Sequence, residues 1–92
     1  MKELNIKELR KKTKEYHNYH GDVNGHYQKL VYDEKGYPYI LTRFKTKAGD
    51  PWSAILSIDM DGDLCEMISG PREDEDALIE QVENDFPNEE VD

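Results

Sequence analysis

The side chains best suited to chemistry or to binding are carboxylates gathered toward the C-terminal end of the chain. Residues 59–92 hold 14 of the 21 Asp and Glu residues and one base, Arg72, whereas residues 1–58 carry an excess of Lys and Arg. No nucleophile stands beside a base, and no carboxylate pair is isolated among apolar residues, as catalysis would require. The pattern predicts charge recognition by a protein that is not an enzyme and needs no cofactor.

The spacing of these carboxylates is close to that of phosphates in DNA. Four of them recur at helical intervals, which place neighbours about 5–6 Å apart on one ridge: Glu73, Asp76, Glu80 and Glu83. Carboxylates between residues 73 and 90 would lie roughly every 3 Å along a helix axis, and one DNA strand carries a phosphate every ~3.4 Å. The sequence therefore predicts a DNA-mimicking surface. Its candidate contact residues are Asp59, Asp61, Asp63, Glu66, Glu73, Asp74, Glu75, Asp76, Glu80, Glu83 and Asp85.

The net charge of −9 indicates the kind of partner. This charge repels nucleic acid and anionic membranes, and it favours a protein with a positively charged groove. No apolar run approaches the roughly 20 residues of a membrane-spanning helix, and no signal peptide opens the chain. The lone cysteine, Cys65, fits a reducing compartment. We therefore expect a soluble intracellular protein that contacts neither membrane nor nucleic acid directly.

Two clusters could be interpreted as metal sites, but their spacing argues against both. His17, His20 and His26 lack the i, i+4 interval that places two histidines over one metal on a helix. Residues 59–63, Asp-Met-Asp-Gly-Asp, are similar to part of a calcium loop. In such a loop Gly stands sixth and a Glu twelfth, whereas here Gly is fourth and the twelfth residue is not Glu. We expect a tight turn at 59–63 and no metal.

The N-terminal segment predicts a helix over about residues 6–19. Asn5 is a suitable N-cap with Glu8 three residues on, and Gly21 would end the helix. Four basic residues share one face of it: Lys7, Arg10, Lys11 and Lys14. Such a face either contacts phosphates or lies in solvent and pairs with the acidic half of the chain. The overall negative charge favours the second interpretation.

Four short runs rich in Tyr, Ile, Thr and Val predict an antiparallel meander: 26–33, 37–47, 52–59 and 64–69. Asp61-Gly62 predicts a two-residue hairpin loop in which both residues have positive φ. In the third run, apolar residues from Trp52 to Ile58 alternate with polar ones, which indicates one buried face. We expect both helices to cover that face.

The acidic segment predicts the last helix. Pro71 is suited to open it, and the acidic residues 73–76 are favoured by the helix dipole. Leu78, Val82 and Phe86 form its apolar stripe and join Trp52 and Ile58 in the predicted core. Pro87 would end the helix, leaving 87–92 as a frayed tail. The expected fold is a single α+β domain over 1–92, with an N-terminal helix, a four-stranded antiparallel meander and a C-terminal acidic helix.

Motifs in the strand-rich middle resemble the phage uracil-DNA glycosylase inhibitor family. That family has Tyr-Asp-Glu, Leu-Leu-Thr, Pro-Trp-Ala and Asp-x-Asn-Gly in this order. Their counterparts here are Tyr32-Asp33-Glu34, Ile40-Leu41-Thr42, Pro51-Trp52-Ser53-Ala54 and Asp59…Asp61-Gly62. The family's Glu-Ser-Ile segment, which grips the glycosylase, has no counterpart, because residues 22–26 read Asp-Val-Asn-Gly-His. The resemblance thus implies a shared fold more than a shared target.

In size, acidity and helix–sheet–helix order, the whole chain is similar to the Arn family of anti-restriction proteins from T-even phages. Members of that family are dimeric DNA mimics that inhibit the modified-cytosine restriction endonuclease McrBC. The resemblance implies a homodimer in the cytoplasm of an infected bacterium, with a host DNA-binding protein as partner. Other functions remain open: displacing DNA from a nucleoid-associated protein, neutralising a nuclease as an immunity protein or antitoxin, inhibiting a uracil-DNA glycosylase, or contacting DNA through the basic helix.

Overall fold

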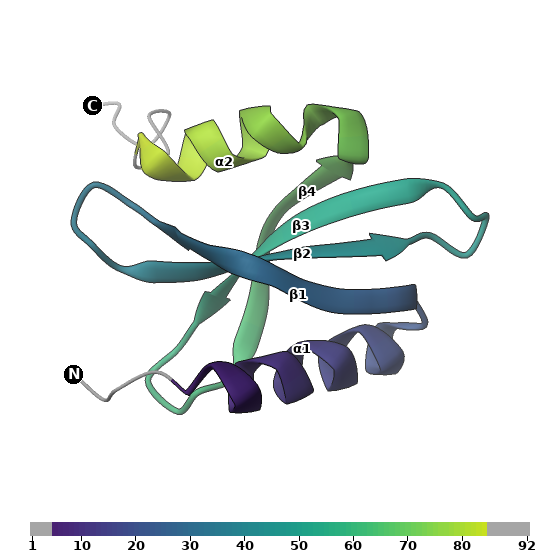
Figure 1. Ribbon diagram of the computed structural model, residues 1–92, viewed down its shortest axis with the longest axis horizontal. Coiled ribbons are helices and arrows are strands. Elements are labelled where there is room, and N and C mark those ends of the chain that lie inside the picture. Colours follow the sequence, from purple (N-terminus) through teal and green to yellow (C-terminus); the bar gives the residue numbers. More distant parts are fainter. Residues whose placement is uncertain (1–4, 85–92) are drawn as a thin grey trace.

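The computed structural model describes residues 5–84, which form a four-stranded antiparallel sheet with one helix on each face (Figure 1). The strands lie side by side in chain order, β1-β2-β3-β4, as a meander. The elements are α1 (Ile6–His20), β1 (Val23–Tyr32), β2 (Pro38–Lys45), β3 (Pro51–Ile58), β4 (Leu64–Pro71), a 3₁₀ turn η1 (Arg72–Asp74) and α2 (Glu75–Glu83). The predicted α+β class and the order helix–meander–helix are confirmed.

The ends of α1 follow the local signals in the sequence. The Asn5 side chain accepts a hydrogen bond from the backbone N–H of Glu8, which caps the first turn. Gly21 has φ +77°, and its N–H donates to the Asn18 carbonyl. A residue with a side chain would be strained in this left-handed conformation, so glycine ends the helix here. The predicted span of 6–19 is confirmed to within one residue.

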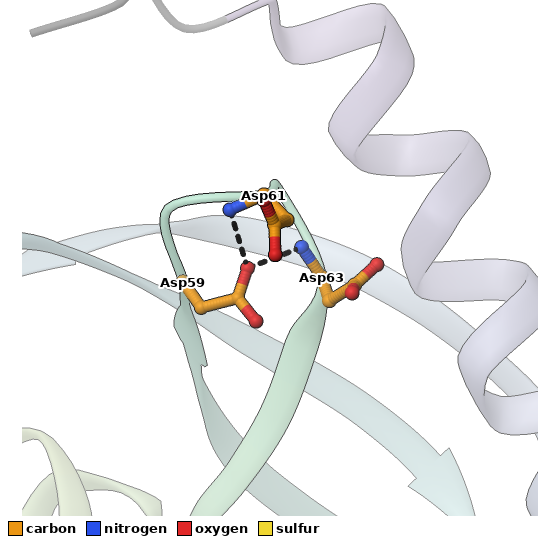
Figure 2. Close-up of side chains that lie close together, drawn as sticks. All are labelled: Asp59, Asp61 and Asp63. Carbon is orange, nitrogen blue, oxygen red and sulfur yellow. Dashed lines mark hydrogen bonds between the residues drawn. The ribbon is translucent and has the colours of Figure 1, made fainter.

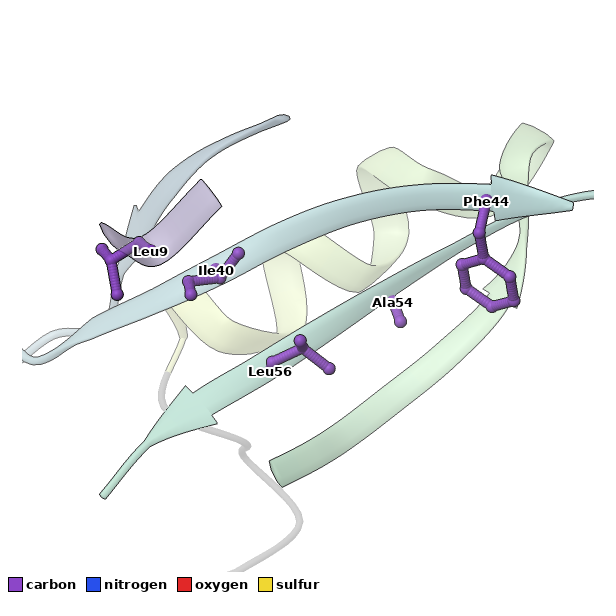
Figure 3. Close-up of a cluster of buried hydrophobic side chains, with 5 residues drawn as sticks. All are labelled: Leu9, Ile40, Phe44, Ala54 and Leu56. Carbon is purple, nitrogen blue, oxygen red and sulfur yellow. The ribbon is translucent and has the colours of Figure 1, made fainter. Parts of the chain in front are cut away.

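The two helices cover opposite faces of the sheet, so the prediction that they share one face is wrong. On one face Leu9 of α1 packs in a cluster with residues of β2 and β3 (Figure 3): Ile40, Phe44, Ala54 and Leu56. On the other face Leu78 and Val82 of α2 belong to a second cluster, with residues of β1, β2 and β3: Val31, Leu41 and Ile55. Residues 53–56 of β3 are all buried, as expected for a strand covered on both faces.

The predicted core residues have different degrees of burial. Leu78 and Val82 of α2 are buried, as predicted. Trp52 and Ile58 are only partly buried and pack at the margin of the α1-side cluster. Phe86 lies outside the described residues.

All three hairpins have the same three-residue loop. In each, the residue before the loop donates its backbone N–H to the carbonyl of the residue after the loop. The glycine that ends the loop donates its own N–H to the carbonyl of the residue before the loop. The loops are flanked by residues 33 and 37, 46 and 50, and 59 and 63. Gly36, Gly49 and Gly62 have φ near +90°, whereas Asp61 does not have positive φ. The predicted two-residue loop at Asp61-Gly62 is therefore wrong, and a type I turn followed by a left-handed glycine takes its place.

A close contact between α1 and β1 explains Gly25, which interrupts an otherwise strand-like segment. His17 is 1% exposed, its Nδ1 lies 2.8 Å from Asp22 Oδ2, and its ring packs on Phe44. A Cβ on Gly25 would lie 2.2 Å from the His17 Cγ. The strand also bulges here, with Asn24 at φ +55°. β1 begins at Val23, three residues earlier than predicted, because its pairing with β2 continues past this bulge to Val23 and Lys45.

The C-terminal helix is shorter than predicted. Pro71 closes β4, residues 72–74 form a 3₁₀ turn, and α2 has nine residues. Asp85, Phe86 and Pro87, together with the predicted tail 87–92, lie outside the described residues. Within residues 5–84, neither helix has both the length and the apolar character needed to cross a bilayer.

Candidate partner-binding surface

The acidic residues that are contiguous in sequence lie in separate places in the fold. The β3–β4 loop, which carries Asp59, Asp61 and Asp63, lies on the α1 side of the sheet, whereas η1 and α2 lie on the other side (Figure 1). A hydrogen bond of 2.9 Å from Lys12 Nζ of α1 to the Gly62 carbonyl holds the loop there. The predicted single acidic surface is therefore divided, and its two main groups are the loop carboxylates and the carboxylates on η1 and α2.

The second group is the larger set of free carboxylates. It lies on η1 and α2, and we call its members the α2 carboxylates: Glu73, Asp74, Asp76, Glu80 and Glu83. All five are exposed, and none of their side chains bonds to another described residue. Three of them occur at i, i+4 and i+7 of α2, while Leu78 and Val82 face the sheet. The predicted ridge of acidic groups thus exists on one side of this short helix.

Glu75 lies in the same segment but is bound internally. Its two carboxylate oxygens accept from Arg43 Nη2 at 2.8 Å and Nε at 2.9 Å, and Ser53 Oγ donates to Oε2 at 2.8 Å. The Glu75 side chain is 12% exposed. The hydrogen bonds from Arg43 lower the pKa of Glu75, and burial opposes them. Glu75 therefore fastens the start of α2 to β2 and β3, and we exclude it from the candidate contact residues.

Replacing Glu75 by Gln is expected to reduce the free energy of unfolding by about 1–2 kcal/mol at pH 7, because charge-assisted hydrogen bonds are lost. The folded-state pKa is depressed, so the stabilisation is present above the usual value near 4.5 and is lost as the pH falls through the folded pKa. The difference between wild type and Glu75→Gln should therefore shrink at pH 3. Urea unfolding at both pH values measures it.

Glu80→Gln is the matched control for that experiment, because Glu80 is exposed and unpaired in the described part of the chain. We expect its unfolding free energy to stay within about 0.5 kcal/mol of wild type at both pH values. Equal effects of the two variants at pH 7 would contradict the structural role of Glu75.

The loop carboxylates include one residue that closes its own hairpin. Asp59 Oδ1 accepts from the backbone N–H groups of Asp61 and Asp63, at 2.9 and 2.8 Å (Figure 2). Asp33 makes the same two bonds in the first hairpin, to the N–H groups of Lys35 and Tyr37, without a second aspartate. The bonds are therefore a feature of the loop type, in which an Asp side chain imitates a backbone turn.

The three loop aspartates are exposed, and their carboxylate oxygens lie within 4.8 Å of one another. Asp61 and Asp63 keep their carboxylates free of bonds to other described side chains. This spacing would admit a cation, but exposed carboxylates of a hairpin tip are commonly close without one, and we assign no metal to them. The loop thus offers negative charge on the α1 side of the sheet.

Glu66 belongs to neither group. It lies on β4 opposite Leu56, on the face that α1 covers. Burial and the neighbouring Glu66 carboxylate raise the pKa of Tyr16 to about 12. Glu66 therefore interacts with α1 and lies away from the α2 carboxylates.

The histidines considered as metal ligands have other partners. His17 is buried against Asp22, and His26 Nδ1 lies 2.9 Å from the Asn24 carbonyl. The His20 ring packs on Tyr16 with 4.4 Å between centroids. Within residues 5–84, the three imidazoles do not converge on one point.

The basic face of α1 is exposed and makes no ion pair with the acidic residues of the described segment. Its members are Lys7, Arg10, Lys11 and Lys14. Arg10 instead lies 5.6 Å from the Tyr27 ring. Among the described residues the expected pairing with the acidic half does not occur as an ion pair. The sheet separates α1 from α2, and the loop aspartates on the α1 side make no ion pair with these four bases. The molecule therefore presents a basic helix on one side and an acidic helix on the other.

The bases closest in sequence to the α2 carboxylates are engaged internally. Arg43 binds Glu75, and Arg72 donates to the carbonyl groups of Phe44 and Trp52. The α2 carboxylates thus present negative charge that these two residues do not neutralise. No protein-family model, curated protein or solved structure matches the chain.

Proposed function

We propose that the protein is a non-enzymatic inhibitor that binds the cationic DNA-binding groove of another protein and excludes DNA from it. The α2 carboxylates take the positions of phosphates. The observation that carries the proposal is the set of five exposed carboxylates without internal partners on one short segment. Lys and Arg side chains of the groove would pair with them, and the anions condensed on the groove would be released.

The way α2 is anchored supports this mechanism. The helix is fixed at its start by Glu75 and Arg43, and along its inner side by Leu78 and Val82. Its carboxylates are therefore held on a packed element before the partner arrives, which lowers the entropy lost on binding. A helix of nine residues is about 13 Å long and corresponds to roughly four phosphate intervals of one strand. A homodimer, which we include in the proposal, would lengthen the surface.

The resemblance to the Arn family makes McrBC the first target to test, in the cytoplasm of a phage-infected bacterium. The experiment is digestion of methylcytosine-containing DNA by McrBC with increasing amounts of the protein. We expect protection that additional DNA reverses. Full digestion at a large molar excess of the protein would remove McrBC as the target. A pull-down with a nucleoid-associated protein and a nuclease as candidates would then follow.

Direct binding of nucleic acid through α1 is the second candidate function. The basic face of α1 favours it, because its four bases are exposed and make no ion pair with another described residue. A gel shift with the purified protein and duplex DNA separates the two functions. The inhibitor function predicts no shift, whereas a shift that Lys11→Glu and Lys14→Glu together remove would establish the second.

A further inference from the structure

An open cleft of about 600 Å³ lies where three parts of the fold meet. The N-terminal half of α1 forms one wall, the end of the β1–β2 loop with the start of β2 forms another, and the end of β3 with the β3–β4 loop forms the third. Its volume is in the range of pockets that bind small molecules. It is separate from the α2 carboxylates, none of which lines it.

The cleft has an apolar rim that is exposed to solvent. Tyr37 is 56% exposed, and Met60, at the tip of the β3–β4 loop, is 100% exposed. Pro38, Tyr39 and Ile58 continue this lining inward. Exposed aromatic and Met side chains gathered around a concavity mark a binding surface more often than isolated ones do.

The charge of the cleft selects the kind of group that fits it. Three carboxylates line it, those of Glu8, Asp59 and Asp61. Lys12 is the one base in the lining, and its Nζ already donates to the Gly62 carbonyl. The carboxylate of Asp61 has no bond to another described residue. The cleft therefore attracts cations and repels anions, although the N-terminus of α1 is nearby.

We propose that this cleft receives an arginine side chain of the partner protein. A guanidinium is planar and weakly hydrated, so it can lie against the Tyr37 ring while its N–H groups pair with the Asp61 and Asp59 carboxylates. The flexible Met60 side chain can close over its apolar stem. A lysine ammonium would make the same charge pairing, but it would gain less from contact with the Tyr37 ring, because it is compact and strongly hydrated. The inference deepens the proposed function, because a DNA-binding groove supplies arginines, and it adds a contact on the α1 side of the sheet.

The test is the binding of tetra-arginine and tetra-lysine peptides, followed by amide chemical shifts. Tyr37→Ala removes no charge, and Tyr19→Ala is its matched control, because Tyr19 is 87% exposed and lies outside the cleft. We expect Tyr37→Ala to weaken tetra-arginine binding about fivefold and tetra-lysine binding less. Tyr19→Ala should change neither. Equal effects of the two tyrosine variants would overturn the proposal.

A second comparison tests the role of the carboxylates. Asp61→Asn and Glu15→Gln each remove one exposed negative charge, but only Asp61 lines the cleft, and Glu15 belongs neither to the cleft nor to the α2 carboxylates. We expect Asp61→Asn to weaken tetra-arginine binding by a larger factor than the control does, and to reduce the peptide-induced shifts at the amides of the flanking Met60 and Gly62. Equal losses would show attraction to the net charge alone and would overturn the site. Displacement of DNA from the target is measured separately, so failure of the cleft leaves the role of α2 open to its own test.

Discussion

Reversing two charges on α2, by Glu80→Lys together with Glu83→Lys, is expected to weaken binding to the cationic partner at least about 100-fold. Each reversal replaces an attraction by a repulsion, and a loss of about 1.4 kcal/mol at each position already gives a factor of ten. The change should leave the fold intact, because both side chains are exposed and unpaired within the described part of the chain. Lysines near the C-terminal end of a helix are also favoured by its dipole. Titration calorimetry and thermal unfolding measure the two effects.

The control for this variant makes the same change in net charge elsewhere. Glu15→Lys together with Glu34→Lys reverses two exposed carboxylates that belong neither to α2 nor to the lining of the cleft. We expect this control to weaken binding only a few-fold, through long-range attraction that salt screens. If both double variants lose the same affinity, the net charge of the protein, and not the α2 carboxylates, governs binding.

Replacing Gly25 by Ala is expected to lower the free energy of unfolding by about 3 kcal/mol, at the upper end of the usual overpacking cost. The added methyl would lie 2.2 Å from Cγ and 2.3 Å from Cβ of His17. The imidazole has little room to move, because Asp22 holds its Nδ1 and Phe44 packs against the ring at 4.7 Å. Urea unfolding measures the loss, and the variant should keep the partner affinity of its folded fraction.

Gly36→Ala is the matched control for the packing effect. A methyl at Gly36 meets no atom within 4 Å, so only the strain of its positive φ of +87° remains. That strain costs about 1–2 kcal/mol. A Gly25→Ala protein as stable as the Gly36→Ala protein would contradict the close packing of β1 on α1.

The parts of the fold that the sequence predicted correctly depend on neighbouring residues. Asn5 and Gly21 define the ends of α1 through hydrogen bonds made within four residues. The strands were recognisable because turn residues separate short β-rich runs, and each turn contains the glycine that its loop requires. Asp61-Gly62 fits a two-residue loop and a three-residue loop, so these two residues do not distinguish the hairpin types.

The faces of the sheet could not be assigned from local pattern. Ser53 is fully buried although it is polar, because Glu75 of α2 accepts its hydroxyl hydrogen. A reading of β3 as alternating therefore placed Ser53 in solvent and both helices on the other face. The partner of Ser53 is 22 residues away in the chain, and no local signal identifies it.

The candidate site was predicted in composition but not in arrangement. Asp76, Glu80 and Glu83 occupy the ridge expected from their spacing, because helical geometry relates spacing to position. Asp59 and Glu66 were grouped with them because they are near in sequence, yet the fold places them on the α1 side. The internal pair of Glu75 with Arg43 joins residues 32 positions apart, and the only local sign of it is a lone arginine in a strand-like run.

The most direct test of the central claim is displacement of a fluorescently labelled DNA duplex from the target protein, followed by anisotropy at several salt concentrations. Competition by the α2 carboxylates predicts complete displacement, with an inhibition constant that rises in proportion to the DNA present and weakens steeply with salt, as phosphate contacts do. Glu80→Lys with Glu83→Lys should abolish displacement. A stable ternary complex of target, DNA and this protein, or displacement that salt does not affect, would contradict the account.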